Sequence, residues 1–169
     1  MGFKDILKLE DLEIEKKFLG PNNQNLELIS SELDVRLNHI CGCITIEEDV
    51  FNNNIDLYTK IKFILGTIYH LLSKNIEIEE RDIIHIIMLY MDNNNDDLTT
   101  EKIIDFYNNK KVILNTFESR KIIAKTLAQK KYMDAIDNSS IVFVTGSAGT
   151  GKTFLATAYA VNLLKKNKI

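Results

Sequence analysis

The sequence is poor in cysteine and contains neither a long apolar run nor a recognisable export signal. Its two cysteines, Cys41 and Cys43, are too few and too close together for a disulfide framework. No apolar run approaches the roughly 20 residues that a membrane-spanning helix needs. The start of the chain alternates charged and apolar residues, without the apolar core and cleavage site of a signal peptide. We therefore expect a cytoplasmic protein with no membrane partner.

A metal site is one interpretation of the alternating residues His39, Cys41 and Cys43. A tetrahedral zinc site needs a fourth ligand, and the sequence offers no second Cys/His pair at the spacing of a zinc finger. The other interpretation is that both thiols lie in a turn or in the core, where free cysteine behaves as a small hydrophobe.

The charge of the chain is unevenly distributed. Hydrophobic residues make up 45% and charged residues 27%, as in an ordinary globular protein. Residues 1–92 carry a net charge of −8 and residues 93–169 carry +5. Nucleic-acid binding needs clustered Lys and Arg, so the acidic first part argues against broad binding there. The basic second part suits a polyphosphate, or docking against the acidic part.

Residue patterning predicts a small α+β sandwich of order β-α-β-β-α-α in residues 1–92. The alternation of Leu12 and Ile14 with glutamates predicts a first strand that ends near Phe18, before the break at Gly20-Pro21. Three helices and a hairpin follow. The first helix is capped by Asn22 or Asn23 and has Leu26, Ile29 and Leu33 on its apolar stripe, and the hairpin turns at Cys41-Gly42-Cys43. The other two helices run from Leu57 to Leu72 and from Glu79 to Met91.

Asn93-Asn94-Asn95-Asp96-Asp97 is the best candidate for a domain boundary, although a surface loop between helices fits nearly as well. Residues 93–125 are expected to be a linker or strap with a short helix and a possible strand at Lys111 to Leu114. A helix is then predicted from Thr126 to about Ile136, which opens a third segment, residues 126–169.

The strongest motif is a phosphate-binding loop that matches G-x-x-x-x-G-K-[ST] at every fixed position. A predicted buried strand, Ile141 to Val144, precedes it, and a predicted helix, Phe154 to about Lys165, follows it. The glycines let the backbone wrap phosphates, the lysine supplies a point charge and the final hydroxyl ligates Mg²⁺. We therefore predict that ATP with Mg²⁺ is bound by Gly146, Ser147, Ala148, Gly149, Thr150, Gly151, Lys152 and Thr153, with Thr153 as the metal ligand.

Gln129 lies upstream of this loop in the predicted helix. A glutamine amide can make a two-point contact with adenine, accepting from the exocyclic amine and donating to a ring nitrogen. Tyr132 is a candidate stacking partner for the base. The alternative is a solvated helix residue between lysines.

These residues resemble a known family. The pattern K-T-x-x-Q-K-x-Y-x-x-A-I followed by G-x-A-G-T-G-K-T-x-L-A, within Thr126 to Leu164, looks like the start of the ATPase domain of PhoH-like proteins. Asn22 to Glu47 is similar to the small KH-like domain in front of it. The resemblance implies ATP binding, ATPase activity in the full-length family, an RNA-metabolism setting and association with an endoribonuclease that matures ribosomal RNA.

The chain departs from the family pattern in three places. Ala124 stands where the family has proline, and residues 1–92 contain no G-x-x-G loop of the kind with which KH domains grip RNA. Only 16 residues follow Thr153, so the second strand with its Mg²⁺-binding Asp and the residue that orients the attacking water are missing. We expect an N-terminal fragment with no catalytic residue of its own, and we count an oligomer among the states open to the full-length form.

Three functions compete. The first is an ATP-binding protein of the PhoH-like type, which does not hydrolyse ATP with these residues alone. The second is an RNA- or protein-binding KH-like module whose phosphate loop is a remnant. The third is a nucleotide or shikimate-type kinase, which usually carries the loop near its N-terminus and lacks the preceding Gln helix.

Overall fold

The computed structural model describes residues 2–92, 99–110 and 112–168 and divides the chain into two compact units, 1–108 and 109–169. The net charge changes sign between them. The first unit has 10 Lys and Arg against 21 Asp and Glu, and the second has 11 against 3. We call them the acidic unit and the basic unit. The sequence placed the boundary at residues 93–97, which lie outside the described residues.

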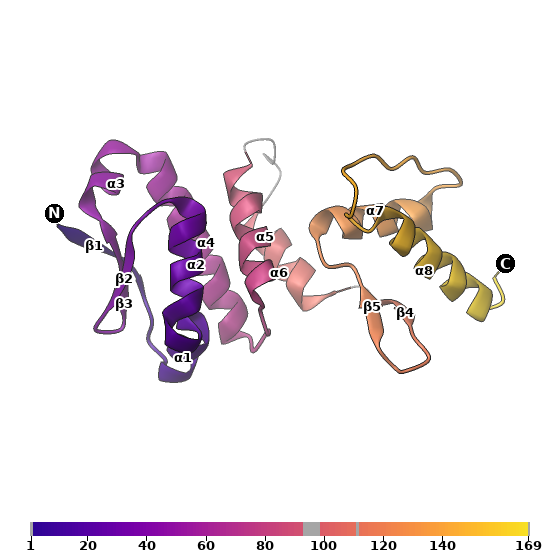
Figure 1. The fold of residues 1–169 in the computed structure, drawn as a ribbon, viewed down its shortest axis with the longest axis horizontal. Helices are drawn as coiled ribbons and strands as arrows, with labels where there is room; N and C mark the ends of the chain where they lie inside the picture. Colours follow the sequence, from indigo (N-terminus) through magenta and orange to yellow (C-terminus); the bar gives the residue numbers. More distant parts are fainter. Residues whose placement is uncertain (1, 93–98, 111, 169) are drawn as a thin grey trace. The chain divides into compact units, whose positions relative to one another are not determined.

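The acidic unit combines one small sheet with a helical layer (Figure 1). Its elements are β1 (Phe3–Lys8), α1 (Leu12–Leu19), the short 3-10 helix η1 (Pro21–Asn23), α2 (Gln24–Leu33), β2 (Leu37–Ile40), β3 (Cys43–Glu47), α3 (Glu48–Asn53), α4 (Ile55–Ser73), α5 (Glu80–Met91) and α6 (Thr100–Asn108). The three strands run antiparallel in the order β1-β3-β2. Helix α4 contacts β1 and α2 contacts β2, so helices cover the sheet where the buried residues Leu37, Ile44 and Ile46 lie.

The predicted strand from Leu12 to Phe18 is wrong, because this segment forms helix α1. The Asp11 carboxylate accepts hydrogen bonds from the backbone N–H groups of Glu13 and Ile14, which caps the helix. Helical spacing also buries Phe18 and Leu19 together at the end of the helix, which a strand could not do because neighbouring residues of a strand face opposite sides. The first strand is β1, earlier in the chain.

The predicted hairpin and the three predicted helices are present in the acidic unit, but the predicted asparagine cap and the predicted order of elements are not. The hairpin of β2 and β3 turns at Cys41-Gly42, and helices α2, α4 and α5 occupy the predicted segments. Asn23 stands at the start of α2 in a left-handed conformation and makes no side-chain cap, so the expected asparagine cap is wrong. Helix α3 forms between β3 and α4, where the sequence predicted no helix, and α1 changes the predicted order of elements.

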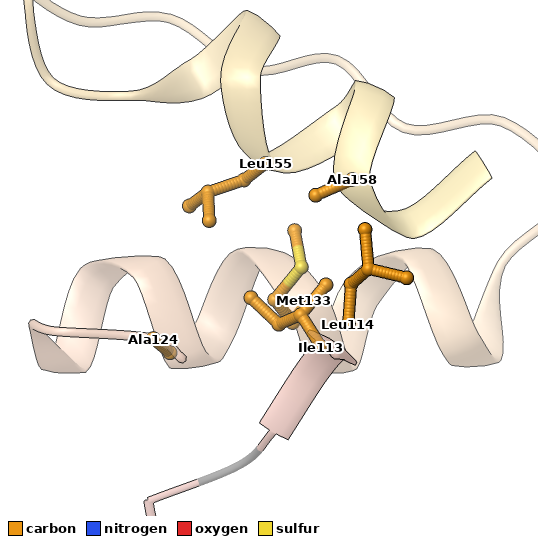
Figure 2. Close-up of a cluster of buried hydrophobic side chains, with 6 residues drawn as sticks. All are labelled: Ile113, Leu114, Ala124, Met133, Leu155 and Ala158. Atoms are coloured by element: carbon orange, nitrogen blue, oxygen red, sulfur yellow. The ribbon is translucent and has the colours of Figure 1, made fainter. Parts of the chain in front are cut away.

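The basic unit contains a two-stranded hairpin and two helices. They are β4 (Val112–Asn115), β5 (Lys121–Ile123), α7 (Leu127–Asn138) and α8 (Lys152–Lys165). Figure 2 shows Leu155 and Ala158 of α8 facing Met133 of α7 and Leu114 of β4. Together with Ile113 and Ala124 they form the buried cluster of this unit. The Tyr159 hydroxyl of α8 donates a hydrogen bond to the Asp137 carboxylate of α7.

The predicted buried strand at Ile141 to Val144 is wrong for this structure. The segment forms no strand, and the exposed fractions of the Ile141 and Phe143 side chains are 75% and 94%. A parallel strand of an α/β fold needs hydrogen-bonded neighbours and helices on both faces of the sheet. The strands described in the basic unit, β4 and β5, pair with each other. Without a partner strand, Ile141, Phe143 and Val144 are exposed and Val142 is only half-buried.

In the described part of the chain, no helix is both long and apolar enough to cross a lipid bilayer.

Candidate functional site

The glycine-rich loop adopts a backbone conformation that its glycines make possible. Gly146, Gly149 and Gly151 have φ angles of 149°, 80° and 85°, a region that residues with a Cβ rarely occupy. Figure 1 shows the loop as part of the long segment that connects α7 to α8. The residues from Gly146 to Thr150 are exposed to solvent. The loop is therefore shaped by its glycines and open to a ligand.

Lys152 places its ammonium group against the backbone of the loop. Its Nζ donates to the carbonyl oxygens of Gly146 at 2.8 Å and Ser147 at 2.6 Å, and lies 3.1 Å from Thr150 Oγ1. These partners hold the positive charge inside the curve of the loop. A phosphate carries a full negative charge, so it would attract this ammonium group more strongly than the carbonyl dipoles do.

Helix α8 begins at Lys152, so its N-terminus lies at the end of the glycine-rich loop. Gly151 is the capping residue and supplies no side-chain hydrogen bond, so the first N–H groups of the helix are not satisfied by a side chain at that position. Such groups, together with the helix dipole, favour an anion. Thr153 lies in the first turn with its side chain exposed. Its hydroxyl is thus accessible to a metal ion bound to phosphates.

The side chain of Gln129, in helix α7, makes a hydrogen bond to the glycine-rich loop. Its Nε2 donates to the Thr150 carbonyl at 3.2 Å, and its Oε1 accepts from the Lys125 N–H at 2.7 Å. A Cβ added to Gly151 would lie 3.5 Å from Gln129 Nε2, which is an ordinary van der Waals contact, so it is the positive φ of Gly151 that favours glycine here. The structure therefore brings Gln129 and the phosphate loop together.

The carboxamide of Gln129 has capacity left for a ligand. A glutamine amide has two N–H donors and two acceptor lone pairs on its oxygen. The contacts with Lys125 and Thr150 use one of each. One donor and one acceptor are left, which is the set that a two-point contact with adenine requires. Tyr132 packs against the buried cluster of the basic unit, so its ring is used there in the core.

The segment Ala124 to Thr126, which we call the strap, lies directly before α7 and contains the residues that sequence reasoning missed. The Thr126 hydroxyl caps α7 by accepting from the Gln129 N–H at 3.2 Å, and Lys125 fixes the Gln129 side chain through its backbone. Ala124, at the position where PhoH-like proteins have proline, is fully buried in the cluster. The signal for this arrangement was a threonine three residues before the glutamine, a common spacing for a helix cap.

His39, Cys41 and Cys43 do not come together as metal ligands. Cys41 is exposed at the hairpin turn, and His39 Nε2 lies 3.2 Å from Glu15 Oε1 of helix α1. Across residues 2–92, 99–110 and 112–168, no three His, Cys, Asp or Glu side chains are grouped so that they could hold a metal ion. The position of Cys41 agrees with the interpretation that the thiols lie in a turn.

A second polar cluster lies between α5 and α6. His85 Nδ1 is 3.1 Å from the Tyr107 hydroxyl, which donates to the Asp82 carbonyl at 3.3 Å. Burial, and then the charge of Asp82, raise the pKa of Tyr107 above its ordinary value. The phenol therefore stays protonated as a hydrogen-bond donor. Asp82 and Glu79 form a capping box at the start of α5, so this cluster connects two helices.

The family model and the relatives that match this chain all carry the description PhoH-like protein. A family model described as PhoH-like protein matches residues 121–169, the segment that holds Gln129 and the loop. A PhoH-like protein of Bacillus subtilis is 30% identical over 163 residues, which cover 96% of this chain and 47% of that protein. The chain thus spans about half the length of this relative.

Shorter matches fall on other relatives. A PhoH-like protein of Mycobacterium leprae is 60% identical over 45 residues, or 27% of this chain and 13% of that protein. One from Synechocystis is 42% identical over 59 residues, or 35% of this chain and 18% of that protein. No solved structure gives a significant match.

Proposed function

Because this chain belongs to the PhoH-like family, we propose that its basic unit binds ATP together with Mg²⁺. Lys152 contacts the β- and γ-phosphates, and the N–H groups from Gly146 to Thr153 surround them. Thr153 would hold the metal ion through its hydroxyl, and the metal ion would neutralise part of the phosphate charge. Gln129 recognises the adenine through its remaining donor and acceptor.

The position of the Lys152 ammonium group is the single observation that carries this proposal. It lies within 2.6–2.8 Å of two loop carbonyls, directly before the N-terminus of α8. A lysine of structural purpose would normally pair with a carboxylate. Here the charge is held by neutral groups in an open loop, which supports a role in attracting an anion.

We assign no catalytic residue to these 169 residues. In P-loop enzymes an acidic residue holds Mg²⁺ and a further residue orients the attacking water. The sequence predicts neither near Thr153. We propose that these 169 residues bind ATP, and we propose no hydrolytic step for them. An RNA-metabolism setting, with an rRNA-maturation endoribonuclease as partner, is part of the same proposal and is supported by the resemblance.

The test is calorimetry of the 169-residue protein with a non-hydrolysable ATP analogue, with and without Mg²⁺. We expect Lys152→Ala to weaken binding about 100-fold, because it removes a charge-assisted contact worth about 2.7 kcal/mol. Lys131→Ala is the matched control, since Lys131 is an exposed cation on α7 outside the loop. Equal affinity of the parent and Lys152→Ala would refute the proposal and favour a phosphate-loop remnant.

A further inference from the structure

The hairpin of β4 and β5 presents an aromatic ring to solvent. Phe117 lies in the loop between the two strands, and its exposed fraction is 102%, that of a fully free side chain. Exposing a whole phenyl ring forgoes about 2 kcal/mol of burial energy, which a structural role would normally recover. Its neighbours Thr116, Glu118 and Ser119 are small or polar, so the ring stands alone.

The loop that carries Phe117 has a defined shape. The Thr116 N–H donates to the Arg120 carbonyl at 2.8 Å, and the Arg120 N–H donates to Thr116 Oγ1 at 3.1 Å. The Ser119 N–H donates to the Thr116 carbonyl at 3.1 Å, and Ser119 has a φ of 61°. These bonds close a tight turn. The ring is therefore held on an ordered backbone, which lowers the entropy cost of binding.

Two cationic residues lie close to this ring in the sequence. Arg120 and Lys121, three and four residues after Phe117, are exposed, and the basic unit as a whole has 11 Lys and Arg against 3 Asp and Glu. Arg120 Nε lies 3.3 Å from Glu118 Oε2, with side chains 82% and 71% exposed. An ion pair this exposed contributes little, so a phosphate can replace it.

The hairpin is fixed to the helix that follows the phosphate loop. Lys165 Nζ at the end of α8 donates to the Asn115 carbonyl at 3.1 Å, and Leu114 packs in the cluster with Leu155 and Ala158. In Figure 1 the hairpin loop and the segment from α7 to α8 lie on opposite sides of these helices. Substitutions at the hairpin loop can therefore be made without touching the nucleotide site.

We propose that the β4–β5 hairpin loop is a contact site for single-stranded nucleic acid, in which Phe117 stacks on an unpaired base and Arg120 and Lys121 bind the neighbouring phosphates. Every base offers a flat face, so stacking on an aromatic side chain together with nearby cations binds single strands without strong sequence preference. This site deepens the RNA setting of the proposed function. It uses no residue of the ATP site, so either proposal can fail alone.

A protein partner is the competing occupant, and the surroundings of the ring disfavour it. Anchoring aromatic residues in protein interfaces lie in the centre of well-packed, desolvated patches. Around Phe117 the loop offers hydroxyls and charges instead of apolar neighbours. The strong positive charge of the basic unit, set against phosphates, is the complementarity that nucleic acid provides.

The experiment is fluorescence anisotropy of the 169-residue protein with labelled single-stranded RNA and DNA of about 12 nucleotides. We expect the parent to bind, Phe117→Ala to weaken binding about ten-fold and Phe117→Trp to restore it, because tryptophan also stacks. Phe117→Leu stays apolar without a flat ring and is expected to behave as Phe117→Ala. Leu12→Ala, at another exposed apolar residue in the acidic unit, is the control.

Salt dependence tests the phosphate contacts. Arg120→Ala and Lys121→Ala should each lower the slope of log affinity against log salt by about 0.7, the value expected for one contact with a single strand. Lys17→Ala, an exposed cation of the acidic unit, should not change it. RNA bound more tightly than DNA would identify the 2′-hydroxyl as part of recognition. A parent that binds no oligonucleotide at low salt, or a Phe117→Ala variant that binds as the parent does, overturns the proposal.

Discussion

Gln129 makes contacts with both parts of the candidate site, the strap before α7 and the phosphate loop. Its amide holds the Thr150 carbonyl and the Lys125 N–H, and it has one donor and one acceptor left. The same side chain can therefore order the loop and read a base. These two roles predict different effects on nucleotides with different bases.

We expect Gln129→Ala to weaken ATP binding about ten-fold and to leave GTP binding nearly unchanged, since guanine offers the wrong donor and acceptor pattern to the amide. Competition between the two nucleotides for a fluorescent analogue measures this selectivity. An equal loss for both nucleotides would mean that Gln129 orders the loop and does not read adenine. A parent that binds ATP and GTP equally well would rule out the adenine role.

Among the elements, helix α1 illustrates how a local hydrogen bond decides between two structures. Its sequence Leu-Glu-Ile-Glu fits the two-residue period of a strand as well as a helix. The Asp11 carboxylate satisfies two N–H groups that would otherwise lack partners at the helix start. The cap, together with the burial of Phe18, favours the helix.

Asp11→Ala should therefore lower the free energy of unfolding by about 1 kcal/mol, the usual effect of losing a cap. Urea unfolding followed by circular dichroism measures the change. Glu10→Ala is the matched control, because the exposed Glu10 carboxylate makes only a 3.8 Å ion pair with Lys8. If both variants unfold at the same urea concentration as the parent, the cap does not stabilise α1.

Helix α4 could be predicted from the sequence because its apolar residues recur at helical spacing over its whole length. Helix α8 could be predicted from its place after the phosphate loop, where the motif requires a helix. The run Ile141 to Val144 could not be predicted in the same way. Its β propensity is high, but a strand depends on a hydrogen-bonded partner that local sequence does not specify.

In the candidate site, too, one feature could be predicted from local sequence and another depends on a distant partner. The glycine spacing predicted the loop, because positive φ angles at Gly146, Gly149 and Gly151 need glycine. The link from Gln129 to Thr150 joins residues 21 positions apart, and no periodicity encodes it. It follows from the strap, whose backbone at Lys125 turns the glutamine side chain toward the loop.

At the scale of the whole molecule, the two units differ in charge and in core size. Among the described residues the acidic unit buries 22 apolar side chains and the basic unit buries six. Hydrophobic burial supplies most of the stability of a domain, so we expect the acidic unit to unfold at a higher denaturant concentration than the basic unit. The positive charge of the basic unit favours polyphosphate ligands there.

Phosphate binding by the glycine-rich loop is tested most directly by the NMR response of the glycine amides to Mg²⁺ and a non-hydrolysable ATP analogue. Hydrogen bonding to phosphate changes the environment of each amide in the loop. We predict that the amide signals of Gly146, Gly149 and Gly151 shift, while those of Gly20, Gly42 and Gly66 in the acidic unit do not. Loop signals that stay in place at saturating nucleotide, or equal shifts in both units, would contradict a phosphate-binding loop.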